Sequence, residues 1–255
     1  MGIGSRSYAR PYVQGGGLPY GIKLLLILNV AVFLLQQFGL NGFLLTNFAL
    51  RPAALLDSFA IWQLVTYMFL HGGIFHILFN MLALWMFGRE LEQTWGTRNF
   101  LRFFFFCGIG AGVCIVLLSY LFGNPNSITL GASGAIYGIL IASAILWPDR
   151  IVYFQMLFPL KMKYMVMIYG AIAFLGTTNI NSGVSDIGHL GGLLCGWIYL
   201  KTPLISGSRR RTSTRRVGPI EWAQQRYKSW KLERNKRKFQ VYMKKHGSNR
   251  DSNVN

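Results

Sequence analysis

The stretch NSITLGASGAIYGILIASAILW, residues 126–147, joins a polar, glycine-containing head to an uninterrupted apolar run. Such a run predicts a helix that enters a membrane, and Ser133 lies at its start, next to Gly134. A hydroxyl in this position either caps and packs the helix or serves as a nucleophile. Most serines in membrane helices are structural, so Ser133 becomes a candidate only if another part of the chain supplies a base.

The composition is that of a polytopic membrane protein rather than a soluble domain. Of 255 residues, 52% are hydrophobic and 13% are charged, and the mean hydropathy is +0.35. The three cysteines all fall inside apolar runs, so no disulfide framework is indicated. No cleavable signal peptide is recognised, and we expect the first apolar run to be retained as a helix.

Six apolar segments predict an all-α bundle of six transmembrane helices. They cover approximately residues 21–40, 73–87, 100–122, 131–147, 164–177 and 187–200. Several are shorter than the roughly 20 residues that a full span needs. Short spans suggest helices that begin below the lipid surface, which would leave a water-accessible cavity open to one face of the membrane.

Basic residues predict the orientation of the bundle. With the N-terminus inside, the positive-inside rule leaves only Arg51 on the outer face, so we expect both termini to be cytoplasmic, in the cell inner membrane. The net charge of +18 is concentrated from Lys201 onward. We therefore divide the chain into a cytoplasmic arm (1–20), a six-helix domain (21–202) and a basic cytoplasmic tail (203–255).

This orientation places two reactive groups at similar depth near the outer face. Ser133 lies at the outer end of the fourth segment, and His189, in SDIGHLGGLLCGW (185–197), lies at the outer end of the sixth. A lone membrane histidine is usually a hydrogen-bonded structural group or a proton relay. The pair is more specific, because a serine is a weak nucleophile until a base takes its proton.

Close helix packing would let the serine and the histidine meet. Glycines recur every four residues on both segments, and such faces allow backbones to approach closely in membranes. The alternative is that these glycines only pack helices. They are Gly134 and Gly138 on the fourth segment, and Gly188, Gly192 and Gly196 on the sixth.

The second segment carries HGGIFHILFN, residues 71–80, in which His76 and Asn80 share one helix face. These two side chains could donate to a developing oxyanion, or they could form an interhelical hydrogen bond. A metal site built from His71, His76 and His189 is conceivable, but no H-E-x-x-H pattern and no carboxylate ligand set accompany them. We therefore expect no metal and no other cofactor.

Two further residues near the pair have simple interpretations. Tyr137 lies one turn below Ser133 on the same face, where it could stack against the imidazole or act as an ordinary buried aromatic. Asp186 lies three residues before His189, where we expect it to cap the helix. A Ser–His dyad is therefore favoured over a triad.

Together, GASGAIYG (131–138), HILFN (76–80) and GHLGG (188–192) resemble the rhomboid family of intramembrane serine proteases over about residues 21–200. The resemblance implies a six-helix bundle with a water-filled cavity that opens to the outer face. It also implies that single-span membrane proteins are cleaved near that face, at small residues and where helix-weakening residues let the substrate unwind.

The resemblance assigns a role to each matching residue. Ser133 would be the nucleophile, His189 the general base, and His76, Asn80 and the Ser133 N–H the oxyanion hole, with Tyr137 packed on the histidine. Three glycines would support the site: Gly131, Gly134 and Gly192.

Two other segments bear on the resemblance. GRELEQTWG resembles a structural glycine–glutamate motif of the family, with Glu92 and Gly96 at the matching positions. The first outer loop (41–62) commonly carries Trp-Arg in the family, and here Trp62 is followed by Gln63. Loss of the arginine donors puts the anchoring of this loop in doubt more than the chemistry.

The sequence therefore predicts an intramembrane serine endopeptidase, with transmembrane proteins as substrates and membrane lipids as surroundings. The alternative is a non-catalytic rhomboid-like protein that binds transmembrane clients, although such proteins usually lack the serine or the histidine. A transporter would be expected to have an internal repeat or a substrate site at the midplane of the membrane, and neither is recognised in the sequence. We expect the basic tail to contact anionic lipid headgroups rather than a specific nucleic acid.

Overall fold

The computed structural model describes residues 17–154, 157–177, 183–202, 231 and 233–234. The chain separates into two compact units, residues 1–207 and 208–255. The helices and the candidate site belong to the first unit. Most of the predicted N-terminal arm and nearly all of the predicted basic tail lie outside the described residues.

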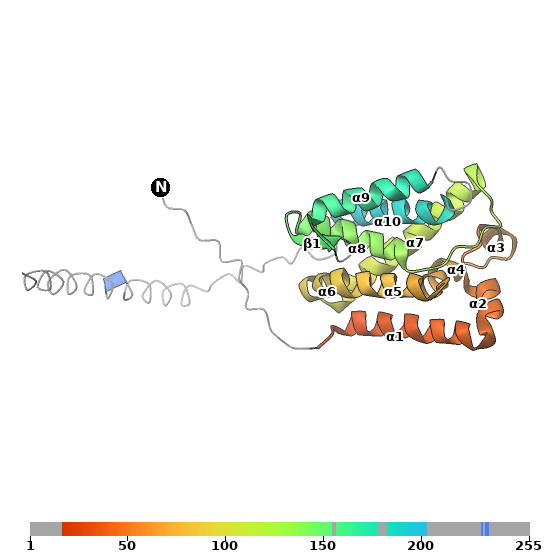
Figure 1. Cartoon of the computed structure of the whole chain (residues 1–255), viewed down its shortest axis with the longest axis horizontal. Helices are drawn as coiled ribbons and strands as arrows, with labels where there is room; N and C mark the ends of the chain where they lie inside the picture. The colour runs from red at the N-terminus through yellow and green to blue at the C-terminus, as the bar shows by residue number, and fades with distance from the viewer. Residues whose placement is uncertain (1–16, 155–156, 178–182, 203–230, 232, 235–255) are drawn as a thin grey trace, which may run out of the picture. The chain divides into compact units, whose positions relative to one another are not determined.

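Each of the six apolar segments contains a helix, and Figure 1 shows several of these helices running lengthwise through the first unit. The segments correspond to α1 (Tyr20–Leu35), α5 (Ile74–Ala83), α7 (Thr97–Phe122), α8 (Ser133–Leu146), α9 (Met162–Gly176) and α10 (Gly183–Lys201). α5 continues through the π-helical turn η3 (Leu84–Gly88) into α6 (Arg89–Trp95). The second helix is therefore longer than its apolar segment predicts.

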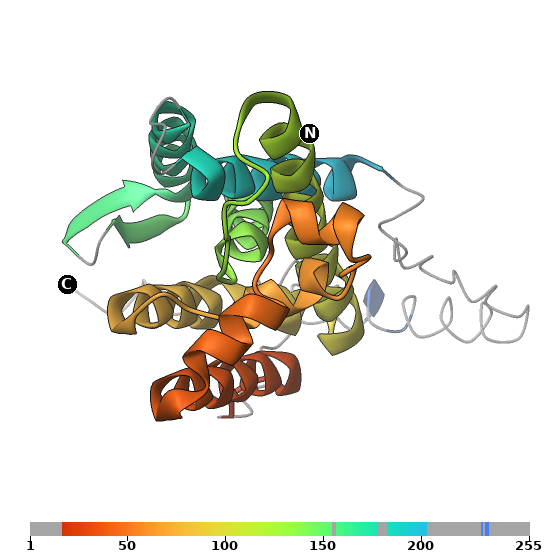
Figure 2. The ribbon, with the colours of Figure 1, turned by 90° about the vertical axis from the view of Figure 1, so that its right-hand side faces the viewer.

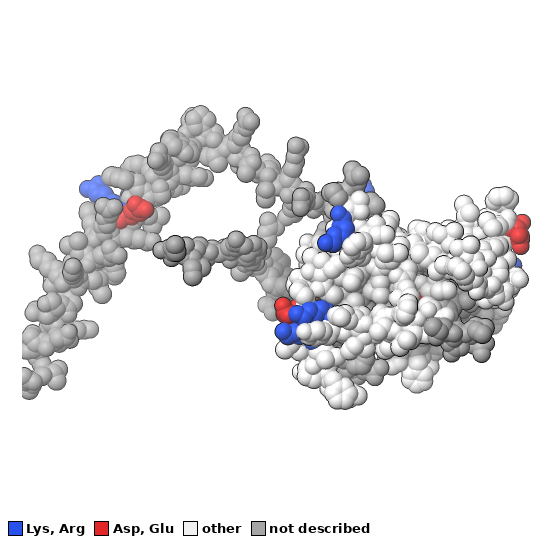
Figure 3. Space-filling model, turned by 90° about the horizontal axis from the view of Figure 1, so that it is seen from above, with Lys and Arg blue, Asp and Glu red and all other residues white. Residues whose placement is uncertain are grey.

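Length and composition identify the first unit as a multi-pass membrane domain. Among the described residues, three helices are long and apolar enough to cross a membrane: Tyr20–Phe48, Ile74–Trp95 and Thr97–Phe122. α8 and α9 are apolar but shorter. Figure 3 shows charged side chains near the two ends of the described unit, separated on that face by a broad uncharged surface.

α8 lies between α10 and α5 (Figures 1 and 2) and packs closely on α7 and α10. A Cβ added to Gly192 would collide with the carbonyl oxygen of Gly134. A Cβ added to Gly196 would lie 3.0 Å from the Cα of Gly138. The glycine faces predicted from the sequence therefore do meet, and they bring the backbones of α8 and α10 into contact.

Glu92, in the middle of α6, connects that helix to the start of α1. Its buried carboxylate accepts hydrogen bonds from the backbone N–H groups of Gly21 and Ile22, both at 2.7 Å, and from the hydroxyl of Thr97. Gly21 and Ile22 are in the first turn of α1, where N–H groups have no partner within the helix. The glutamate has the structural role that its motif suggested.

The connection between α1 and α5 is anchored through Gln63, although the arginine of the family is missing. The loop contains α2 (Asn41–Phe48), α3 (Pro52–Asp57) and α4 (Gln63–Thr66). The buried Gln63 amide accepts from the backbone N–H of Arg51 at 3.0 Å and donates to the carbonyl of Asn47 at 3.4 Å. Because an amide carries both a donor and an acceptor, Gln63 ties two segments of the loop together, which answers the doubt about its anchoring.

A short β-hairpin lies among the helices of the described residues, and the all-α prediction missed it. β1 (Ile151–Phe154) pairs antiparallel with β2 (Phe158–Lys161) between α8 and α9. In the turn before β1, hydrogen bonds from Lys163 and Lys161 hold the pKa of the exposed Asp149 below its usual value. The segment is too short and too apolar for its alternation to stand out from the flanking helices.

Candidate active site

Ser133 is the first residue of α8, and Gly131, two residues earlier, shapes the turn that presents it. Gly131 has a φ of +117°, a conformation that a residue with a side chain rarely adopts. Its N–H donates to the carbonyl oxygen of Tyr67 at 2.8 Å, which fixes the turn. Because Ser133 begins the helix, its own N–H has no intrahelical acceptor and lies at the positive end of the helix dipole.

His189, from α10, meets this serine across the helix interface. Its Nε2 lies 2.9 Å from Oγ of Ser133, although the two residues are 56 positions apart in the sequence. The imidazole is stacked on the ring of Tyr137, with centroids 4.3 Å apart and planes 7° from parallel. The structure therefore places Ser133, His189 and Tyr137 together, in the arrangement that the sequence suggested.

Asp186 occupies a different place from the one predicted. We expected it to cap α10, but α10 begins at Gly183, so Asp186 is inside the first turn. One of its carboxylate oxygens, Oδ1, lies 3.5 Å from Nδ1 of His189. An acidic group therefore faces the nitrogen of His189 opposite to the one that contacts Ser133.

His76 and Asn80, both from α5, face the same turn. A Cβ built on Gly131 would lie 2.8 Å from Nε2 of His76 and 3.8 Å from Nδ2 of Asn80. The N–H of Gly72 donates to Nδ1 of His76 at 3.3 Å, so the neutral ring carries its proton on Nε2. Nδ2 of the buried Asn80 has no hydrogen-bond partner among the described residues. Two N–H donors are therefore available near Ser133.

His71 does not take part in a metal site in the described parts of the chain. It lies in the loop before α5, where its ring packs edge-on against the ring of His76 with centroids 5.1 Å apart. Burial lowers the pKa of His71 to about 4, so the ring is neutral. Among the described residues, no group of three His, Cys, Asp or Glu side chains is arranged to hold a metal ion.

A model of the rhomboid domain matches residues 58–204, more than half of the chain. This chain belongs to the rhomboid family. RHOMBOID-like protein 1 of Arabidopsis thaliana is 31% identical over 171 residues, which cover 66% of this chain and 42% of that protein. Rhomboid protease GluP of Bacillus subtilis (strain 168) is 31% identical over 184 residues, which cover 71% of this chain and 34% of GluP.

A shorter relative gives similar identity. The putative rhomboid protease YdcA of Bacillus subtilis (strain 168) is 29% identical over 154 residues, which cover 59% of this chain and 70% of YdcA. This rhomboid spans less than half the length of the first two relatives.

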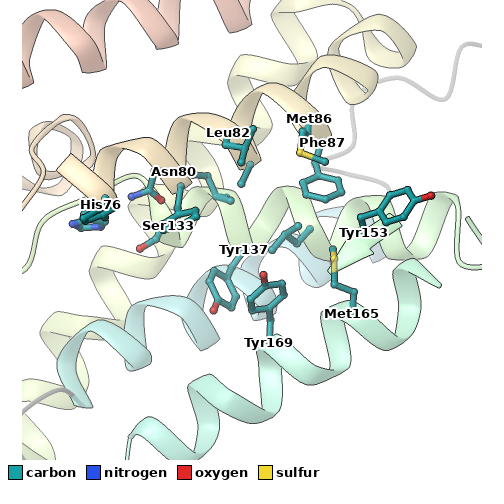
Figure 4. Close-up of a pocket in the computed structure, with 15 residues that line it drawn as sticks. His76, Asn80, Leu82, Met86, Phe87, Ser133, Tyr137, Tyr153, Met165 and Tyr169 are labelled. Atoms are coloured by element: carbon teal, nitrogen blue, oxygen red, sulfur yellow. The ribbon is translucent and has the colours of Figure 1, made fainter. Parts of the chain in front are cut away.

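Two cavities open beside Ser133 in this rhomboid. The smaller, of about 90 Å³, is bounded by Ser133, His76 and His189. The larger, of about 700 Å³, is mainly apolar and extends between α5–η3 and α8–α9. Figure 4 shows His76, Asn80 and Ser133 toward one end of it and Tyr153 of β1 toward the other. An extended chain lying in this groove would pass the serine.

Sequence reasoning missed two residues that shape the site. Tyr67 holds the Gly131 turn through its carbonyl oxygen, and its buried hydroxyl donates to the carbonyl of Gly108 at 2.7 Å. Thr129 lines the smaller cavity, and its buried hydroxyl has no hydrogen-bond partner among the described residues. Tyr67 begins the short 3₁₀ turn η2 (Tyr67–Phe69) and Thr129 lies in a loop, and neither segment is long enough to give a periodic signal that could have identified them.

Proposed function

We propose that this rhomboid is an intramembrane serine endopeptidase that works through a Ser133–His189 pair. The observation that carries the proposal is the 2.9 Å contact between the serine hydroxyl and Nε2 of the histidine. This distance is within hydrogen-bond reach, which a general base needs in order to take the hydroxyl proton.

In the proposed reaction, His189 accepts the Ser133 proton while the serine oxygen attacks a peptide carbonyl carbon. The negative charge that develops on the carbonyl oxygen is stabilised by Nε2–H of His76, Nδ2 of Asn80 and the N–H of Ser133. The protonated His189 then gives its proton to the leaving amine, and water hydrolyses the acyl-enzyme by the same route.

The substrates proposed are transmembrane proteins whose helix unwinds near the outer face. An intact helix hides its carbonyl groups in its own hydrogen bonds, so cleavage needs a locally extended segment. The apolar groove beside Ser133 suits such a segment, and the cavity of about 90 Å³ suits a small side chain at the cleavage point.

We further propose that the domain crosses the inner membrane six times, with both termini cytoplasmic, the cavity open to the outer face and lipids around it. The spans would be α1, α5–α6, α7, α8, α9 and α10. In this arrangement Ser133 and His189 both lie near the outer surface of the membrane. The arm (1–20) and the basic tail (203–255) would lie on the cytoplasmic side, where the tail could contact anionic headgroups.

The proposal is tested on purified protein with a model transmembrane substrate and a serine-reactive fluorophosphonate probe. Wild type should cleave the substrate and be labelled, and S133A and H189A should lose cleavage. S143A is the matched control, because Ser143 lies on the same helix, where its buried hydroxyl donates to the carbonyl of Ile139. Full cleavage by S133A would refute the assignment, and an inactive, unlabelled wild type would favour a non-catalytic client-binding protein.

A further inference from the structure

The carboxylate of Asp186 lies beside Ser133 and His189, and a mechanism of two residues assigns no role to it. We propose that Asp186 is a positioning residue that orients His189 and stabilises its protonated form. This inference rests on the proposed function, since it concerns how efficiently the histidine serves as a base.

The tautomer that His189 needs as a base has its N–H on the side that faces Asp186. To accept the Ser133 proton, Nε2 must be free of hydrogen, so the neutral ring must carry its proton on Nδ1. Oδ1 of Asp186 is 3.5 Å from that Nδ1, and both side chains are mostly buried, with 18% of the aspartate and 21% of the histidine exposed. The acceptor therefore lies on the side where the required tautomer has its donor.

The contact is looser than a strong hydrogen bond, which ideally needs a nitrogen–oxygen distance near 2.9 Å. Catalytic contacts in proteins without substrate are often long and tighten when the substrate binds. Asp186 precedes His189 by three residues on α10, so the two side chains share a helix face.

The chemical contribution would be electrostatic. When His189 takes the Ser133 proton it becomes positively charged, and a negative carboxylate beside Nδ1 lowers the energy of that state. The carboxylate keeps its own charge throughout, so no proton passes to it. Tyr137 fixes the plane of the imidazole by stacking, which leaves Ser133 and Asp186 facing its two nitrogens.

α9 provides the space that this carboxylate occupies. A Cβ added to Gly176, the last residue of α9, would collide with Oδ2 of Asp186. The glycine therefore permits the carboxylate to lie against α9 while its other oxygen faces the histidine. G176A consequently disturbs the carboxylate from a different helix, without touching Ser133 or His189.

The test measures kcat and KM for the transmembrane substrate in D186E, D186N and D186A, with thermal unfolding of each variant. We expect kcat to fall by about 10- to 100-fold in D186N and D186A, with KM and the midpoint of unfolding nearly unchanged. D186E, which keeps the charge, should recover part of the loss. D149N is the matched control, because it removes an exposed carboxylate that is bonded to lysines.

A double-mutant cycle makes the test independent of any folding defect at Asp186. G176A should lower kcat in the wild-type background and have no further effect in D186A, where the carboxylate is absent. Wild-type kcat in D186N and D186A would overturn this inference and leave the proposed function intact. An additive effect of G176A and D186A would also overturn it. An inactive wild type would instead refute the proposed function.

Discussion

At the scale of single residues, the candidate site combines a serine–histidine contact with a buried donor that has no partner among the described residues. The buried amide of Asn80 is the clearest example, because its Nδ2 has no hydrogen-bond partner among the described residues. An unpaired buried donor costs free energy in the resting protein. Such a cost is expected at a site where charge develops during a reaction, because the donor is then oriented in advance.

N80A should therefore lower kcat more than it changes KM. Loss of one oxyanion donor commonly costs about 2.7–4 kcal/mol of transition-state stabilisation, or roughly 100- to 1,000-fold in kcat. Folding should change little, because Nδ2 of Asn80 has no hydrogen bond among the described residues that the variant would break. The measurement is steady-state cleavage in detergent, and kcat within twofold of wild type would exclude Asn80 as a donor.

Most of these residues were predictable from the sequence, and the position of one was predicted wrongly. The serine, the histidine and the His76–Asn80 pair were predictable, because polar side chains are conspicuous in apolar helices. Asp186 was misassigned as a cap because a carboxylate near a helix start is usually one, and only coordinates show where the helix begins. Catalytic roles for these residues stay predictions.

At the scale of elements, the site depends on how closely α8 and α10 approach. G192A would drive a methyl group into the carbonyl oxygen of Gly134, the residue after Ser133. Because both atoms belong to rigid helices, the helices must separate, at a cost of about 1–3 kcal/mol or more. We expect G192A to lower the unfolding midpoint and to lose cleavage.

A glycine-to-alanine change elsewhere supplies the control for this prediction. At Gly170 on α9, the added Cβ would meet only the flexible end of Leu193, at 3.4 Å. G170A should keep cleavage and be neutral or slightly stabilising, because alanine favours helix more than glycine does. Equal behaviour of G192A and G170A would contradict the packing argument.

A second prediction at this scale concerns the attachment of α1. E92Q should destabilise the fold by about 1–3 kcal/mol, because the charged acceptor for two N–H groups of the first turn is lost. E90Q, two residues earlier, removes a partly exposed partner of Arg150 and should cost less than about 1 kcal/mol. Thermal unfolding in detergent checks both, and an E92Q midpoint no lower than that of E90Q would disprove the capping role.

Helices were predictable where the hydrophobic pattern of the sequence was strong. The six helices follow from their apolar runs, with ends that shift by a few residues. The β1–β2 hairpin was missed because a short apolar strand looks like the end of a helix. The anchoring by Gln63 was missed because a substitution shows which donors are lost but not which acceptor the new side chain gains.

At the scale of the whole molecule, the charge distribution predicts one orientation in the membrane. The positive-inside rule places Ser58, in the first outer loop, outside, and Thr94, on α6, inside. Both residues are exposed, so cysteines at these positions would be accessible to a reagent on the correct side. After replacement of the three native cysteines, S58C should react with a membrane-impermeant maleimide in intact cells, and T94C only after lysis.

Labelling of T94C in intact cells, with S58C protected, would show that the domain has the opposite orientation in the membrane. Ser133 would then face the cytoplasm, and an enzyme cutting at the outer face would be excluded, whatever the distance between its serine and histidine.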